Sequence, residues 1–276
     1  WGMHGFYLLF ALWQWIAWDF DQYNDFHTFY TSARVFVDAL PDLYDQSQYG
    51  YFFRYMPLAP LGYLWTLPFS FHQAGVLSCF LNFCVVLSTF YLTKRLVTAN
   101  PSYFSEEKFS WFYAIYLAAP HHLDLYRMGQ NTGMMLLLVL VAYFFFSEEN
   151  HSHEFLGGVL FGCACTVKAT LFLWSPLLLL AGNIPWATRK NLKKGIKEGS
   201  HWVWQRKGRF LGFVLPFLAN CLVFLRLPPL WDGFYEVNLG ETSRGVLDWT
   251  FSISNLFEMA CGWDEYLVFV VGLCFS

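Results

Sequence analysis

Long apolar runs separated by short polar segments dominate this sequence. The runs cover residues 2–18, 56–69, 75–92, 109–119, 134–146, 155–167, 169–182 and 210–224, and another begins at Tyr266. Several are shorter than the roughly 20 residues that a membrane-spanning helix needs, so tilt or neighbouring residues must supply the remaining length. The pattern predicts an all-α fold, a polytopic transmembrane helical bundle that forms one domain over residues 1–276.

The composition strengthens this prediction. The chain has 276 residues, of which 56% are hydrophobic, 22% aromatic and only 13% charged, outside the usual range of soluble proteins. A net charge of −3 gives no reason to expect a nucleic-acid partner. The chain opens on Trp1 and stops at Ser276 inside an apolar run, so we expect a fragment that lacks its C-terminal helices.

Basic residues give the bundle an orientation. Eight lysines and arginines against one glutamate lie between Arg189 and Arg209, which predicts a cytoplasmic loop at 183–209. Lys94, Arg95 and Lys108 should lie on the same side. The four apolar runs between these two basic sites return the chain to that side if Lys168 marks a turn.

The run at 56–69 should not cross the membrane, because the count of crossings places both of its ends outside. It contains Pro57, Pro60 and Pro68, and we expect a juxtamembrane or re-entrant helix. The outer face then gathers two large extracytoplasmic loops, 19–74 and 227–264, together with residues 120–133 and the turn at Lys168. Functional groups are expected there.

Acidic residues cluster at the start of the first outer loop, at Asp19, Asp21 and Asp25. On a helix, Asp21 and Asp25 would share one face. Carboxylates so close oppose each other's ionisation, which suits a general base. A solvated acidic loop without a catalytic role explains the same residues equally well.

Three cations are candidates for binding a phosphate group: Arg54, Arg127 and Lys168. Lys168 lies between two apolar stretches, where a cation usually faces a polar cavity or pairs with an anion. Snorkelling to the membrane interface is the alternative for Lys168, and a structural role is the alternative for both arginines. His121, His122 and Asp124 do not have the spacing of a metal site, and we expect neither a metal nor a cofactor.

The order of several motifs resembles glycosyltransferase family 87, the polyprenol-phosphate-mannose-dependent mannosyltransferases of the GT-C superfamily. The motifs are residues 24–33 (NDFHTFYTSA), 43–45 (LYD), 53–58 (FRYMPL), 129–131 (GQN) and 157–162 (GGVLFG) followed by Lys168. The similarity spans residues 15–182. Phe29, Met56 and Ala169 depart from a Tyr, a Pro and a Pro in the family's pattern.

A second resemblance is to the catalytic subunit of glycosylphosphatidylinositol mannosyltransferase I, whose Arg-Tyr-Thr-Pro-Leu is similar to residues 54–58. The second acid of that family's Asp-x-Asp motif is His27 here, which favours family 87.

The resemblance implies a GT-C fold with juxtamembrane helices in the first outer loop, and transfer of a hexose, mannose first among the candidates. A polyprenyl- or dolichyl-phosphate sugar would be the donor and a lipid or glycan the acceptor, with inversion. Asp25 would be the base, with Asp21 or Asp19 as its neighbour or substitute, and Arg54, Lys168 or Arg127 would bind the phosphate. Tyr30, Tyr55, Gln130 and Asn131 would contact the substrates.

The expected location is a prokaryotic plasma membrane or the endoplasmic reticulum membrane, with an extracytoplasmic or luminal active site and membrane lipids around the bundle. Two alternatives stay open. A lipid or lipid-linked sugar transporter or flippase would also place acids and cations inside a membrane protein. A non-catalytic GT-C-like subunit would keep the fold and tolerate the loss of Asp25.

Overall fold

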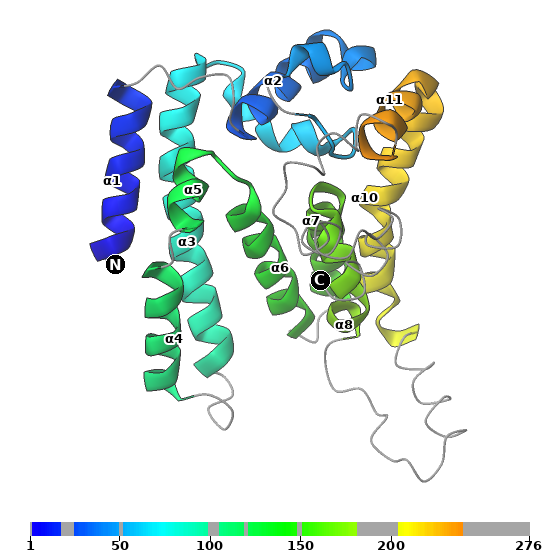
Figure 1. Ribbon diagram of the computed structural model, residues 1–276. Coiled ribbons are helices and arrows are strands. Elements are labelled where there is room, and N and C mark those ends of the chain that lie inside the picture. The colour runs from blue at the N-terminus through cyan, green and yellow to red at the C-terminus, as the bar shows by residue number, and fades with distance from the viewer. Residues whose placement is uncertain are drawn as a thin grey trace, which may run out of the picture.

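A computed structural model describes residues 2–17, 25–49, 52–98, 105–118, 121–147, 151–180 and 204–239 (Figure 1). These residues form helices and connecting turns and contain no strand, which confirms the all-α prediction. The α-helices are α1 (Gly2–Ala17), α2 (Asp25–Asp38), α3 (Phe71–Thr98), α4 (Glu106–Ala118), α5 (His121–Arg127), α6 (Thr132–Ser147), α7 (His151–Val167), α8 (Ser175–Leu179), α10 (Lys207–Arg226) and α11 (Pro228–Leu239). The 3₁₀-helices are η1 (Leu40–Asp42), η2 (Gln46–Gln48), η3 (Ala59–Thr66) and η4 (Ala169–Trp174).

The helices form an upright bundle with a cap across one end (Figure 1). The long helices α3, α6, α7 and α10 stand side by side, with α1, α4 and α5 against α3. The cap consists of α2, the segment with η1 to η3, and α11. Within the cap, α2 and the segment with η1 to η3 belong to the predicted outer loop 19–74, and α11 belongs to the predicted outer loop 227–264.

Glycines bring α7 and α10 into close contact. A Cβ atom at Gly158 would lie 2.2 Å from the Arg209 carbonyl oxygen, and one at Gly212 would lie 2.2 Å from that of Phe155. Only residues without a side chain let two helix backbones approach this closely, a common device in membrane helix pairs. The glycine-rich motif at 157–162 therefore packs two helices together.

One end of the bundle is organised around a buried arginine. Arg209 is 0% exposed and donates hydrogen bonds to the Leu179 and Phe146 carbonyl oxygens (3.0 and 3.2 Å) and to Glu154 (3.1 Å). These contacts bring together the ends of α6 and α8 and the starts of α7 and α10. The Arg95 guanidinium at the end of α3 lies 4.7 Å from the Phe144 ring, at the same end of α6.

Arg95, Arg206 and Arg209, which belong to or adjoin the predicted cytoplasmic loops, thus lie at one end of the bundle, and the cap lies at the other. Lys168 has an extended backbone between α7 and η4. The chain turns there, as the sequence predicted, because Arg209 contacts both Glu154 near the start of α7 and Leu179 at the end of α8. This arrangement agrees with the parity of the predicted crossings.

Two of the described helices, Phe71–Val97 and Lys207–Arg226, are long and apolar enough to cross a membrane. Large apolar side chains also point outward along helices at intervals of three or four residues. On α10 these are Leu211, Leu215, Leu218, Leu222 and Leu225, and on α1 they are Met3, Phe6, Leu9, Trp13 and Ile16. Exposed apolar stripes of this length are typical of surfaces that face lipid.

The apolar run at 56–69 forms the short helix η3. Its eight residues rise about 2 Å each, so the whole helix is much shorter than the ~30 Å thickness of the hydrocarbon core. The prolines explain why the helix is short, because Pro60 occupies the first turn of η3 and Pro68 follows its end. The structure thus makes this run too short to span.

Candidate active site

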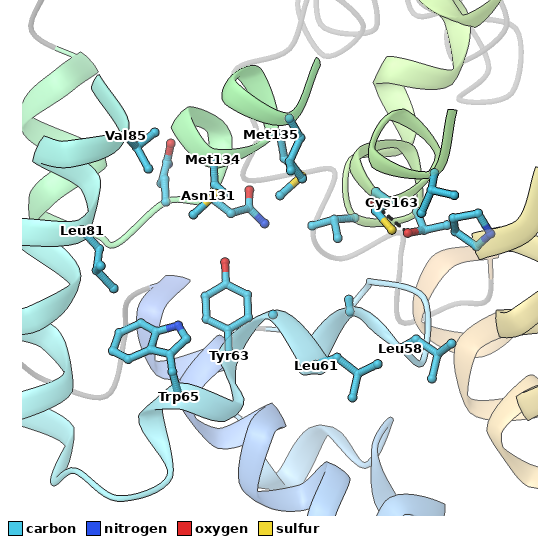
Figure 2. A pocket seen from close by; sticks show the side chains of 18 of the residues that line it. Leu58, Leu61, Tyr63, Trp65, Leu81, Val85, Asn131, Met134, Met135 and Cys163 are labelled. Carbon is cyan, nitrogen blue, oxygen red and sulfur yellow. Dashed lines mark hydrogen bonds between the residues drawn. The ribbon is translucent and has the colours of Figure 1, made fainter. Parts of the chain in front are cut away.

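A cavity of about 550 Å³ lies between the cap and the long helices (Figure 2). Its walls come from η3, α3, the residues between α5 and α6, α6, α7 and α10. Most of the lining is aliphatic, including Leu58, Leu61, Leu81, Val85, Met134, Met135, Leu138, Val159 and Leu215. Polar groups are few, and Tyr63, Gln130 and Asn131 are among them.

α10 fixes the start of η3 above this cavity. Asn220, a buried residue of α10, accepts a hydrogen bond from the Leu58 backbone N–H (2.9 Å) and donates one to the Pro216 carbonyl oxygen (2.8 Å). The cap is therefore attached to the bundle by a specific polar contact within an apolar wall.

Asp25 is the first residue of α2, where its carboxylate interacts favourably with the positive end of the helix dipole. The next residue is anchored, because the Phe26 N–H donates to the Met128 carbonyl oxygen at 2.9 Å. Gly129 follows with a φ of +61°, and a Cβ there would lie 2.6 Å from the Phe26 Cβ. Asp25 is thus held beside the segment that leads to Gln130 and Asn131.

Phe29 shares a helix face with Asp25, because four residues separate them on α2. Its ring stacks on Tyr63 with 4.4 Å between ring centroids and an angle of 3°, and it packs on Tyr55 at 5.1 Å. Asn131 lies near both tyrosines, and Figure 2 shows the Tyr63 hydroxyl directed toward it. Asp25, Tyr55, Tyr63 and Asn131 therefore form one polar group at the edge of the cavity.

Burial raises the pKa of both phenols, and the charge of Asp25 raises it further, whereas the Asn131 side chain acts in the opposite direction. Tyr55 and Tyr63 therefore remain protonated around neutral pH and can donate hydrogen bonds. The Tyr55 backbone is fixed as well, since its carbonyl oxygen accepts from the Tyr44 hydroxyl at 2.7 Å.

Arg54 is half-buried next to this group. Burial lowers the pKa of its guanidinium, and the neighbouring Tyr55 raises it. Its Nε and Nη2 atoms are buried and have no hydrogen-bond partner among the described residues. A guanidinium in this state is a candidate for binding an anion with two parallel hydrogen bonds.

Lys168 lies at the other side of the Gln130–Asn131 segment. Its Nζ donates to the Thr132 hydroxyl at 3.1 Å, and Thr132 directly follows Asn131. The two residues before Lys168, Thr166 and Val167, line the cavity. The structure therefore brings together three segments that were predicted separately, around Asp25, Asn131 and Lys168.

The remaining predicted site residues have different positions. Gln130 lines the cavity, and Arg127 is exposed at the end of α5. The Tyr30 hydroxyl donates to the Phe69 carbonyl oxygen at 3.0 Å, so it is engaged in holding the cap. Asp19 and Asp21 lie outside the described residues.

Tyr63 is the site residue that sequence reasoning missed. A 3₁₀-helix has three residues per turn, so Pro60, Tyr63 and Thr66 share one face of η3, and Pro60 and Thr66 are buried. A search with a period of three, not 3.6, would have indicated this face.

Comparison with known proteins identifies the family. Glycosyltransferase family 87 matches residues 52–274, most of the chain. The chain belongs to this family. No curated protein and no solved structure matches the chain.

Membership in family 87 makes the protein a glycosyltransferase. The matched region contains Arg54, Gln130, Asn131 and Lys168, and it begins after Asp25, so the position of Asp25 in the site rests on the geometry. The match gives no support to the resemblance to glycosylphosphatidylinositol mannosyltransferase I. It also extends further toward the C-terminus than the similarity at residues 15–182 that the motifs indicated.

Proposed function

We propose that this protein is a multi-pass GT-C-type membrane enzyme that transfers a hexose, with mannose first among the candidates, from a polyprenyl- or dolichyl-phosphate sugar to a lipid or glycan acceptor. The observation that carries the proposal is the cavity, which is apolar along most of its wall and ends at Asn131, Tyr63 and their neighbour Asp25. An apolar wall suits a prenyl chain, and the polar end suits the sugar.

The reaction would be a single displacement. The Asp25 carboxylate takes the proton of an acceptor hydroxyl while the acceptor oxygen forms a bond to the anomeric carbon. The bond between that carbon and the phosphate oxygen breaks, and its electron pair leaves with the lipid phosphate. Attack from the side opposite the phosphate inverts the anomeric carbon.

The departing phosphate gains negative charge, which nearby cations stabilise. Two guanidinium nitrogens of Arg54 have no hydrogen-bond partner within the described part of the chain, and Lys168 lies beside the Asn131 segment, so these two are the preferred phosphate ligands. Arg127, exposed at the end of α5, is the third. The site would face the extracytoplasmic or luminal side, because the basic ends of the helices lie opposite the cap.

The test uses membranes from cells that express the protein, supplied with radiolabelled polyprenyl-phosphate mannose. We expect label in a new lipid or glycan product, and we expect Asp25→Asn to reduce this transfer by at least ~100-fold, the usual contribution of a general base. Asp38→Asn, at the exposed opposite end of the same helix, is the matched control and should retain transfer.

Full transfer by Asp25→Asn would contradict the assignment of the base. Movement of the labelled lipid across the membrane without sugar transfer would instead indicate a carrier.

A further inference from the structure

The polar end of the cavity contains a pair of side chains to which the mechanism above assigns no step. We propose that Tyr63 and Asn131 form a subsite that binds a hydroxyl group of the transferred sugar, which makes Tyr63 a specificity-determining residue. The inference rests on the proposed function and deepens it, because it names what distinguishes one donor sugar from another.

Asn131 gives the first reason. It is 6% exposed, lines the cavity, and its amide nitrogen Nδ2 has no hydrogen-bond partner among the described residues. A buried amide group without a partner is unfavourable, so a ligand that supplies an acceptor is expected at this position. The left-handed backbone of Gly129, two residues earlier, helps to fix Asn131 in place.

Tyr63 gives the second reason. Its ring is held by the stacked Phe29 ring, and its hydroxyl points toward Asn131 (Figure 2). Because burial raises the pKa of this phenol, the hydroxyl keeps its proton and can both donate and accept a hydrogen bond. Its position is therefore defined before any substrate arrives.

The chemistry of the pair selects a sugar over the other parts of a lipid-linked donor. A sugar hydroxyl both donates and accepts, which matches an amide N–H next to a phenol. A phosphate oxygen is better matched by Arg54 or Lys168, and a prenyl chain makes no hydrogen bonds. The Asp25 charge acts on Tyr63, so the bound sugar would adjoin the proposed base.

The experiment measures binding, which needs no acceptor. Short-chain polyprenyl phosphates of mannose, and the same compounds lacking the 2-, 3-, 4- or 6-hydroxyl, are titrated into the protein in detergent and the heat of binding is measured by calorimetry. For one deoxy compound we expect the dissociation constant of the unmodified protein to rise about 10-fold, as when a site built to bind a hydroxyl meets a ligand without it.

Tyr63→Phe should weaken binding of the intact donor by a similar factor and leave that one deoxy compound unaffected, so that the difference between the two donors disappears. Asn131→Ala should remove the same difference, which keeps the test valid if one variant is unstable. Tyr49→Phe is the control, because it removes a hydroxyl that donates to the Leu43 carbonyl oxygen away from the cavity. It should keep the full 10-fold difference.

The inference would be overturned if the deoxy compound still binds about 10-fold more weakly than the intact donor in both Tyr63→Phe and Asn131→Ala. That result would leave the proposed transfer reaction intact. A protein that binds the donors with hydroxyl selectivity but transfers no sugar in membranes would overturn the proposed function instead. The two failures are therefore separable.

Discussion

Arg54 is the residue whose surroundings say most about the ligand. It is half-buried, with two guanidinium nitrogens that have no hydrogen-bond partner among the described residues. Burying a guanidinium charge costs free energy unless an anion pairs with it and accepts its hydrogen bonds. The lipid phosphate of the proposed donor would be that anion.

We expect Arg54→Lys to weaken donor binding by about 10- to 100-fold, since a lysine cannot replace two parallel hydrogen bonds and a charge-assisted bond contributes ~1.5–3 kcal/mol. The dissociation constant of a polyprenyl-phosphate sugar measures the effect. Arg226→Gln, at the exposed end of α10, removes a cation elsewhere and should change it little. Equal binding by both variants would remove Arg54 from the phosphate site.

At the scale of elements, the contact between the start of α2 and the segment before α6 positions the proposed base. This contact requires two features: the hydrogen bond from the Phe26 N–H to the Met128 carbonyl oxygen, and the absence of a side chain at Gly129. The contact joins residues about a hundred positions apart in the chain, so a change in either segment should move Asp25.

Gly129→Ala should therefore lower both the melting temperature and the rate of sugar transfer. An alanine in the left-handed region costs roughly 1–2 kcal/mol, and its Cβ would also collide with Phe26. Gly5→Ala is the matched control, because a Cβ there would meet no atom of the described residues within 4 Å, and α1 should be unaffected or slightly more stable. The measurements are thermal unfolding in detergent and transfer in membranes, and unchanged values for Gly129→Ala would refute this role of the contact.

Helices were the easier part to predict from sequence. The run at 75–92 became α3 and the run at 210–224 became α10, and in both the helix continues into polar residues such as Lys94 and Lys207 because these favour helix as well. The run at 56–69, which the charge parity predicted not to span, forms the short helix η3, and its place beside the membrane stays a prediction. The periodicity of apolar residues indicates which face of a helix is buried, but it does not indicate which distant segment packs on that face. The contact between α2 and Met128 could therefore not be predicted from the sequence.

The site was predicted in part for the same reason. The Gly129–Asn131 motif and Lys168 were identified separately, and the structure brings them together through Thr132. Tyr63 was missed because its face is defined by the geometry of a 3₁₀-helix. Tyr30 matched the family's pattern, yet its hydroxyl is engaged with the Phe69 carbonyl oxygen.

For the molecule as a whole, the separation of a basic end from a capped end predicts how it sits in a membrane. Asp45→Asn creates a glycosylation sequon at residues 45–47, in an exposed turn of the cap, and the new side chain can still accept from the Ser47 N–H. In microsomes we expect glycan on this variant. The natural sequon that begins at Asn150 should stay unmodified, because it would lie in the cytoplasm.

Enzymatic removal of the glycan, read as a mobility change on a gel, checks both sites. Glycan at Asn150 and none on the Asp45→Asn variant would reverse the orientation and place the cavity on the cytoplasmic side.

The glycine-lined contact between α7 and α10, secured by Arg209, has a consequence for how the molecule can be assembled. α10 is held to α7 by backbone approach and to α6 and α8 by hydrogen bonds from one side chain. None of these contacts depends on the covalent connection between residues 180 and 204. Two separately translated pieces, divided within that stretch, should find each other in the bilayer and rebuild the same cavity.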